Sequence, residues 1–279
     1  DTGFMVFNNK TYPHFVELLE LLGVAVRDSD MSFSVSCRRT GLEYQGSSLN
    51  GLFAQRSNLL RPSFYHMLWD IVRFNRIATE AVSARTLENG LTVGEFLREH
   101  HFGAPFRNHY LVPMVAAIWS AEPHTVLSFP AKFLIGFMVN HGLLQLRDRP
   151  QWKTIVGGSQ NYVEPLVAPF RQRIRLNAPV AAVRRHAERV EVQFGNNETE
   201  QFDQVVFATH ADQTLKLLVD ATDREVHILA GFRYQPNEAV LHTDRSLLPR
   251  RERAWASWNY HLSAQDGEPA TVTYDLSRL

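Results

Sequence analysis

The region between Trp152 and Val183 constrains the fold most, because it places a strand, two adjacent glycines, a helix and a second strand in direct succession. Gly157 and Gly158, followed by Ser159, let the backbone approach a ligand closely where the helix begins. Amide groups at a helix N-terminus attract anionic or electron-rich groups. Such a turn is typical of a cofactor-binding α/β sheet, although paired glycines also occur in turns that bind nothing.

Size and charge restrict the class of function. A chain of 279 residues can bury a large core and form one or two domains. Its 29 basic and 29 acidic residues balance, so the composition shows no general attraction to nucleic acid or to an anionic membrane. The single cysteine, Cys37, excludes an internal disulfide and favours a passive buried thiol in a predicted strand over a reactive thiol. We therefore expect a cytoplasmic protein without nucleic acid as a partner.

The two ends of the sequence predict a piece of a longer protein. The chain begins at Asp1 without a methionine or a signal-like segment, and residues 271–279 read as a strand that is cut short. No apolar run is long enough to span a membrane.

Helices are predicted where apolar residues recur at helical spacing after a capping residue or a proline. The predicted helices begin after Thr11, near residue 61, at Thr92 with its capping-box partner Glu95, at Pro113, at Pro130, near Tyr162 and near Ala211. Together they make residues 55–148 a largely helical and unusually apolar stretch.

Strands are predicted where apolar and polar residues alternate, or where a short apolar run lies between turns. The predicted strands cover residues 24–26, 32–37, 42–45, 153–156, 173–176, 180–185, 189–194, 204–208, 238–242, 254–260 and 271–274. The run 204–208 is continuously apolar after its first residue, which indicates a strand buried on both faces.

Four stretches together resemble the flavin-containing amine oxidase superfamily, which also includes protoporphyrinogen oxidase and the carotenoid desaturases. They are residues 1–4 before a helix, 156–159 at the start of another, 179–180 on a strand, and 203–209. Within the superfamily the chain is most similar to a bacterial group of predicted FAD-binding proteins.

The resemblance implies an α/β fold, which is α+β in this fragment. It would consist of part of a Rossmann-like FAD-binding domain and a substrate domain with a mixed or antiparallel sheet and a helical cap. The FAD-binding parts would be residues 1–23 and 152–223, and the substrate parts would be residues 24–151 and 224–279.

FAD is the cofactor that the resemblance implies. Its contacts would come from Thr2, Gly3 and Phe4 near the flavin ring, from Gly157, Gly158 and Ser159 at the glycine turn, from the main chain of Val180 near the adenine, and from Ala208 and Thr209 at a strand end. Core packing is the alternative for Val180 and Ala208. The family's Gly-x-Gly-x-x-Gly loop and its C-terminal flavin-contacting segment are absent, so we expect this fragment alone to bind FAD weakly or not at all.

The implied function is that of a FAD-dependent oxidoreductase of the amine oxidase or desaturase type, which transfers hydride from a hydrophobic substrate to the flavin. Amine oxidases commonly carry a lysine on the strand that corresponds to residues 239–244, and this chain has none there. His242 or Asp244 would then handle water or protons, although a plain sheet histidine is the alternative for His242. The alternative function is a non-catalytic flavin-fold module that binds a lipid or a protein partner.

Polar and aromatic groups in the helical stretch are candidates for the substrate pocket: Trp119, Ser120, Asn140 and His141. Buried polar groups need partners, which either a pocket or an Asn-His pair in the core can supply. The apolar surroundings favour a hydrophobic small molecule or a lipid as substrate, and they leave transient membrane contact and a location at the membrane periphery open. The histidines lack metal-ligand spacing and Ser159 lacks a Gly-x-Ser-x-Gly setting, so we expect neither a metal site nor a nucleophilic serine.

Overall fold

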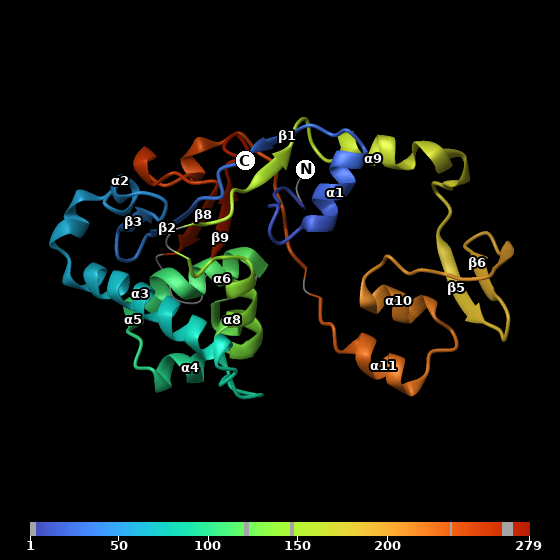
Figure 1. Ribbon diagram of the computed structural model, residues 1–279, viewed down its shortest axis with the longest axis horizontal. Coiled ribbons are helices and arrows are strands. Elements are labelled where there is room, and N and C mark those ends of the chain that lie inside the picture. Colours follow the sequence, from blue (N-terminus) through green and yellow to red (C-terminus); the bar gives the residue numbers. More distant parts are fainter. Residues whose placement is uncertain (1–3, 120–122, 146–147, 235, 264–269) are drawn as a thin grey trace. The chain divides into compact units, whose positions relative to one another are not determined.

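The computed structural model describes residues 4–119, 123–145, 148–234, 236–263 and 270–279 (Figure 1). The chain divides into two compact units. Unit 1 comprises Asp1–Leu166 and His242–Leu279, and unit 2 comprises Val167–Leu241. The mixture of helices and sheets agrees with the predicted fold class. The assignment of segments to an FAD-binding and a substrate domain stays a prediction.

Unit 1 holds most of the helices. They are α1 (Pro13–Leu21), α2 (Leu49–Leu52), α3 (Pro62–Ser83), α4 (Val93–Glu99), α5 (Ala104–Phe106), α6 (Val112–Trp119), α7 (Pro123–Val126) and α8 (Ala131–Asn140), and α9 (Gln160–Val167) runs up to the boundary with unit 2. Shorter helical turns are η1 (Arg56–Leu60), η2 (Arg107–Leu111), η4 (Arg245–Leu247) and η5 (Glu252–Ala254). The predicted capping box starts α4: Glu95 N donates to Thr92 Oγ1 over 3.2 Å, and Thr92 N donates to Glu95 Oε2 over 2.8 Å.

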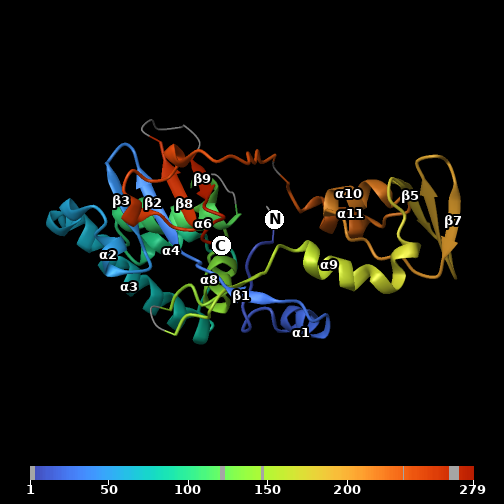
Figure 2. The same ribbon diagram turned by 90° about the horizontal axis from the view of Figure 1, so that it is seen from above.

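A mixed four-stranded sheet is the centre of unit 1. Its strands are β2 (Phe33–Cys37), β3 (Leu42–Gln45), β8 (Trp258–Leu262) and β9 (Thr271–Tyr274), and they lie in the order β3-β2-β8-β9 (Figure 2). The pair β2 and β8 is parallel, and the other pairs are antiparallel. The sequence predicted either a mixed or an antiparallel sheet here, and the sheet is mixed.

Side chains alternate between the two faces of this sheet. Val35 lies opposite Tyr44 on one side and Tyr260 on the other, and all three belong to the apolar core shared with the helices. The same core includes Cys37, whose thiol is buried as predicted. The opposite face carries small polar residues such as Ser34 and is described with the site below.

A smaller two-stranded sheet pairs β1 (Val26–Asp28) with β4 (Lys153–Ile155) in antiparallel register. Phe7 forms an isolated bridge to Lys153 beside it. Phe7, Leu19 of α1 and Ile155 form a second small core. The segment before the paired glycines is thus a strand, as predicted, and it packs with the start of the chain.

Unit 2 is built from a three-stranded antiparallel sheet and two helices. The strands are β5 (Val180–Arg185), β6 (Val190–Phe194) and β7 (Thr199–Phe202), and the helices are α10 (Ala211–Leu217) and α11 (Asp223–Ala230), preceded by the turn η3 (Ala168–Arg173). The predicted hairpin is confirmed. Among the described residues of this unit, the buried apolar side chains are Val183, Val192 and Leu218.

Three predicted strands are wrong: residues 173–176, 204–208 and 238–242 have no strand structure. Val206 is 91% exposed, although its segment reads as a strand buried on both faces. No strand in the described part of the chain pairs with this segment, and an apolar run without a neighbouring strand lacks hydrogen-bond partners. The strand predicted at 254–260 begins only at Trp258, because η5 ends at Ala254 and residues 255–257 form an irregular connection.

Candidate functional site

The paired-glycine turn joins β4 directly to α9. Gly157 and Gly158 have φ of 77° and 95°, in the left-handed region that glycine adopts readily. Asn161 Nδ2 closes the turn by donating to Val156 O over 2.6 Å. A Cβ atom on Gly157 would lie 2.5 Å from that nitrogen and would displace the Asn161 side chain, and the left-handed φ also favours glycine there.

The backbone of this turn already uses part of its hydrogen-bonding capacity. Gly158 N donates to Ile155 O over 3.2 Å, and the oxygens of Gly158 and Ser159 accept from the first turn of α9. The sequence suggested that the Gly158 amide is available to a ligand, but this amide is already engaged within the turn. Cofactor binding by Gly157, Gly158 and Ser159 stays a prediction.

Phe4 lies in a cluster of aromatic rings next to this turn. Its ring centroid is 5.6 Å from that of Tyr12 and 5.2 Å from that of Phe15, and Phe15 in turn contacts Tyr162 of α9 at 5.4 Å. Two predicted cofactor regions, Phe4 and the glycine turn, are thus brought to the same part of unit 1. Thr2 and Gly3 lie outside the described residues.

The ring contacts continue from Phe4 to the helices of unit 1. Tyr12 meets His141 at 6.4 Å, His141 stacks on Phe137 at 3.9 Å, and Phe137 meets Trp119 at 4.5 Å. We call these five residues, Phe4, Tyr12, His141, Phe137 and Trp119, the aromatic row. It connects a residue predicted near the flavin with two residues predicted in the substrate pocket.

His141 has a defined orientation within the aromatic row. Its Nδ1 lies 3.0 Å from Phe137 O. Because a carbonyl oxygen only accepts, this contact assigns the donor role to Nδ1 and leaves Nε2 outside that hydrogen bond. Burial raises the pKa of the neighbouring Tyr12, which stays a neutral donor. The row is an apolar surface with one basic nitrogen.

Two other predicted pocket residues do not join the row. Asn140 is the exposed last residue of α8, so the interpretation of a buried Asn-His pair is wrong. Ser120 lies outside the described residues. Sequence reasoning missed Phe137, although its position four residues before His141 on one apolar helix was a usable signal.

Unit 2 contains an apolar hollow of about 510 Å³. It is lined by Val180, Val183, Val192, Val205, Val206, Phe207, Ala208, Thr209, Gln213, Lys216 and Leu217. The hairpin supplies one wall, α10 another, and the predicted strand 204–208 a third. Val180, Ala208 and Thr209, all predicted to contact the cofactor, therefore line one hollow within one unit.

Polar groups are few around the hollow. Thr209 Oγ1 lies 2.8 Å from Thr214 Oγ1, and Lys216 pairs with Asp212 at 3.8 Å. The lining is otherwise dominated by valine, leucine and phenylalanine side chains, which suit a flat apolar ring system better than a charged group.

The predicted catalytic pair lies in an exposed turn of unit 1. Asp244 N donates to His242 Nδ1 over 3.1 Å, and Ser246 N and Oγ donate to the Asp244 carboxylate over 2.8 and 2.9 Å. These hydrogen bonds, with a smaller contribution from His242, lower the pKa of Asp244. The carboxylate therefore caps η4 in its ionised form, and a catalytic role for either residue stays a prediction.

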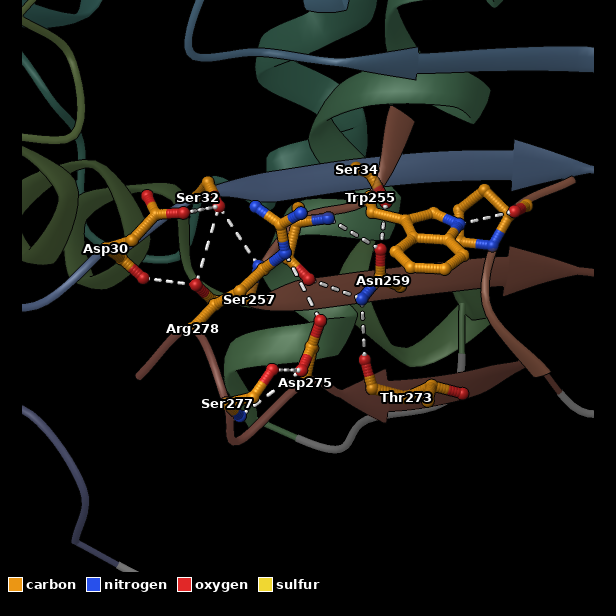
Figure 3. Close-up of polar contacts among 12 residues, drawn as sticks. Asp30, Ser32, Ser34, Trp255, Ser257, Asn259, Thr273, Asp275, Ser277 and Arg278 are labelled. Atoms are coloured by element: carbon orange, nitrogen blue, oxygen red, sulfur yellow. Dashed lines mark hydrogen bonds and ion pairs between the residues drawn. The ribbon is translucent and has the colours of Figure 1, made fainter. Parts of the chain in front are cut away.

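The polar face of the four-stranded sheet holds a hydrogen-bonded network that the sequence reading missed (Figure 3). Asn259 accepts from Ser34 Oγ over 2.8 Å and from Ala256 N over 2.9 Å, and it donates to Ala256 O over 2.6 Å and to Thr273 O over 3.1 Å. Its amide is saturated, so it holds strands and loop together rather than awaiting a ligand. Small polar residues at every second position, Ser32, Ser34 and Ser36, were the signal for this face.

The described part of the chain contains no group of three His, Cys, Asp or Glu side chains that could hold a metal ion. None of the described helices combines the length and the apolar composition that crossing a bilayer requires.

Comparisons with known proteins show the family and the fold. The family model of flavin containing amine oxidoreductases matches residues 1–255. No curated protein matches the sequence. Similar solved structures include cyclohexylamine oxidase from Brevibacterium oxydans (18% identity, TM-score 0.59, covering 82% of this chain and 51% of that one). A cofactor-binding redesign of putrescine oxidase matches at 16% identity and a TM-score of 0.59, covering 82% of this chain and 51% of that one.

A third similar structure is the CLA-producing fatty acid isomerase from P. acnes, at 13% identity and a TM-score of 0.56, covering 82% of this chain and 52% of that one. At these identities the likeness shows the fold. The chain spans about half the length of each of these structures.

Proposed function

Because the chain belongs to the family of flavin-containing amine oxidoreductases, we propose that the whole protein is a FAD-dependent oxidoreductase that moves hydride from a hydrophobic substrate to the flavin. The observation that supports this most directly is the aromatic row. It joins Phe4, the predicted flavin contact, to His141 and Trp119, the predicted substrate contacts, within unit 1.

The apolar hollow of unit 2 fits the adenine end of FAD. Val180 and Ala208 line it, and the small side chain of Ala208 leaves room for a flat ring. We assign no residue to the diphosphate, because the sequence has no Gly-x-Gly-x-x-Gly loop and the Gly158 amide serves its own turn. When bound, FAD supplies the hydride acceptor, and the protein supplies orientation and exclusion of water.

The aromatic row supports a substrate with an apolar body. Its rings offer flat surface, and its single basic nitrogen, His141 Nε2, can take a proton as the substrate is oxidised. His242 and Asp244 stay candidates for the same role, but the hydrogen bonds from Asp244 N to His242 and from Ser246 N to Asp244 already stabilise a turn. A fatty acid isomerase among the similar folds is compatible with a lipid substrate. No lysine lies between residues 217 and 279, the region in which amine oxidases commonly carry one.

The test is anaerobic reduction of the flavin in the protein at its full natural length. Candidate amines, polyenes and fatty acids are added in turn, and loss of the absorbance of oxidised flavin is followed by stopped flow. Bleaching by one class supports the oxidoreductase and names its substrate. Flavin that stays oxidised across all classes supports the non-catalytic module that binds a lipid or protein partner.

Single substitutions identify which residue accepts the proton. His141→Phe keeps the ring stacking but removes Nε2, so we expect the bleaching rate to fall about 100-fold. His14→Phe, on the exposed start of α1, is the matched control and should leave the rate unchanged. A rate that drops for His242→Phe and not for His141→Phe would move the role to His242.

A further inference from the structure

An exposed apolar surface lies on α2, η1 and α3 of unit 1. Its members share high exposure despite large apolar side chains: Leu49, Leu59, Leu60, Tyr65, Trp69 and Val72. Leu60 is 87% exposed, Leu49 76% and Trp69 68%. We call this set the α3 surface. Clustered exposed side chains of this size mark a contact site rather than ordinary surface.

Helix α3 carries this surface as a second apolar stripe. Its first stripe faces the core and includes Phe64, Met67, Ile71, Phe74 and Ala78. The second consists of Tyr65, Trp69 and Val72, which recur at helical spacing on the exposed side. Arg76, one turn further along, continues this side of the helix as a charged residue. A helix that only covers a core needs one apolar stripe, so the second requires another explanation.

The preceding segment is continuous with the exposed stripe. Tyr65 Oη donates to Leu59 O over 3.0 Å, and the Tyr65 ring lies 6.3 Å from the ring of Phe53. Helix α2 and the segment that follows it lie at the outer margin of unit 1 in both views (Figures 1 and 2). The exposed leucines of η1 therefore extend the stripe beyond the helix itself, and Phe53 at the end of α2 connects it to that helix.

The charged side chains around the surface are mainly arginines. From Leu49 to Arg76 the charged residues are Arg56, Arg61, Asp70, Arg73 and Arg76. The single carboxylate, Asp70, is buried, accepts from Gly103 N over 2.9 Å and pairs with Arg73 at 2.7 Å. No exposed carboxylate thus occurs in this segment, and the next one along α3 is Glu80.

The turn η5 contacts α2 and adds to this bias. In and beside η5, two exposed arginines, Arg250 and Arg253, outnumber the one exposed carboxylate, Glu252. The fourth charged residue, Arg251, is paired with Glu43 at 2.7 Å. The surroundings of the α3 surface are therefore basic, although the chain as a whole has no net charge.

We propose that the α3 surface binds the headgroup region of an anionic phospholipid bilayer. Tryptophan and tyrosine favour the boundary between headgroups and acyl chains, leucines enter the acyl region, and arginines reach the phosphates while their stems lie on apolar surface. The attraction is local, since the balanced total charge supplies none. This inference goes beyond the proposed chemistry and does not depend on it.

The test is sedimentation of the full chain with vesicles of phosphatidylcholine alone and of phosphatidylcholine with about one third phosphatidylglycerol. We expect binding to the mixed vesicles and at least about tenfold weaker partitioning into the neutral ones. Trp69→Ser should lower the partition coefficient about tenfold. Arg76→Glu should also lower it about tenfold at low salt, and less as salt screens the charge.

Matched controls remove the same groups elsewhere on unit 1. Leu21→Ser, at a side chain that is 79% exposed on α1, and Lys10→Glu should leave the partition coefficient unchanged. Thermal unfolding of every variant shows whether the fold is kept. Brominated lipid should quench the parent's fluorescence more strongly than that of Trp69→Phe, because Trp69 is the tryptophan placed in the bilayer.

Three results would overturn the proposal. One is equal binding to neutral and anionic vesicles, and another is equal loss in the control variants. The third is absence of vesicle binding together with self-association in solution that Trp69→Ser abolishes, which would assign the surface to a second copy of the chain.

Discussion

Unit 1 and unit 2 bury their apolar segments to very different degrees. In unit 1 the mixed sheet has one face against helices and its other face in a hydrogen-bonded network around Asn259. In unit 2 the run 204–208 is as apolar as any strand of unit 1, yet Val206 is 91% exposed. The difference teaches that an apolar run becomes a strand only where a neighbouring strand supplies hydrogen-bond partners.

The largest expected contrast between the units concerns cavity formation. Phe106 is fully buried and its ring contacts Phe74, Phe102 and Tyr110. Phe106→Ala should lower the free energy of unfolding by about 4 kcal/mol. Leu241→Ala, at a side chain that is 81% exposed, should change it by less than about 0.5 kcal/mol. Denaturant titration measures both, and comparable losses would show that residue 241 is covered in solution.

The second contrast tests the polar face of the sheet. Asn259→Ala leaves Ser34 Oγ and the Ala256 and Thr273 backbone groups without their partner in a buried setting. We expect a loss of about 3 kcal/mol in the free energy of unfolding, because buried polar groups without partners are costly. Asn140→Ala, at an exposed position, is the control and should cost much less. A small loss at Asn259 would mean that water replaces its hydrogen bonds.

The sequence predicted local features well. The capping box of Thr92 and Glu95 involves residues three apart, and the turn at Gly157 and Gly158 involves residues within five positions of each other. The long amphipathic α3 was predicted from spacing within one element. Such features depend on neighbours along the chain, which the sequence displays directly.

Long-range partners could not be predicted. Ser34 bonds Asn259 across 225 positions of sequence, and no local pattern indicates that pairing. The aromatic row joins Tyr12 to His141, which only the tertiary fold brings into contact. The same limit explains the error at 204–208, where the composition of a strand was present but its neighbours were not.

A smaller effect concerns the ion pairs that hold unit 2 together. Arg185 donates to Glu225 over 2.7 and 3.0 Å and to Asp220 over 3.1 Å. The hydrogen bonds from Arg185 and from Thr222 lower the pKa of Glu225 from 4.5 to about 2. The stability that Glu225 contributes is thus present above pH 4.5 and is lost as the pH falls to about 2.

Titration of Glu225 by NMR checks this value. In Arg185→Gln the pKa of Glu225 should rise toward its ordinary value, while in Arg189→Gln, the control on the same hairpin, it should stay low. If both variants leave the pKa of Glu225 unchanged, its hydrogen bonds with Thr222 alone account for the shift.

The smallest expected effect concerns the half-buried His261 in unit 1, which should make the free energy of unfolding depend on pH in mild acid. Burial and Arg38 lower the pKa of His261 from 6.5, against opposing contributions from Glu43 and the Leu247 backbone. Below pH 6.5 the unfolded chain therefore binds a proton that the folded chain resists, so the free energy of unfolding falls as the pH is lowered through this range. His261→Gln should flatten that slope, while His14→Gln, at an exposed histidine, should not. Denaturation curves between pH 7 and 5 measure the slope, and an unchanged slope in His261→Gln would mean that His261 is protonated freely in the folded chain.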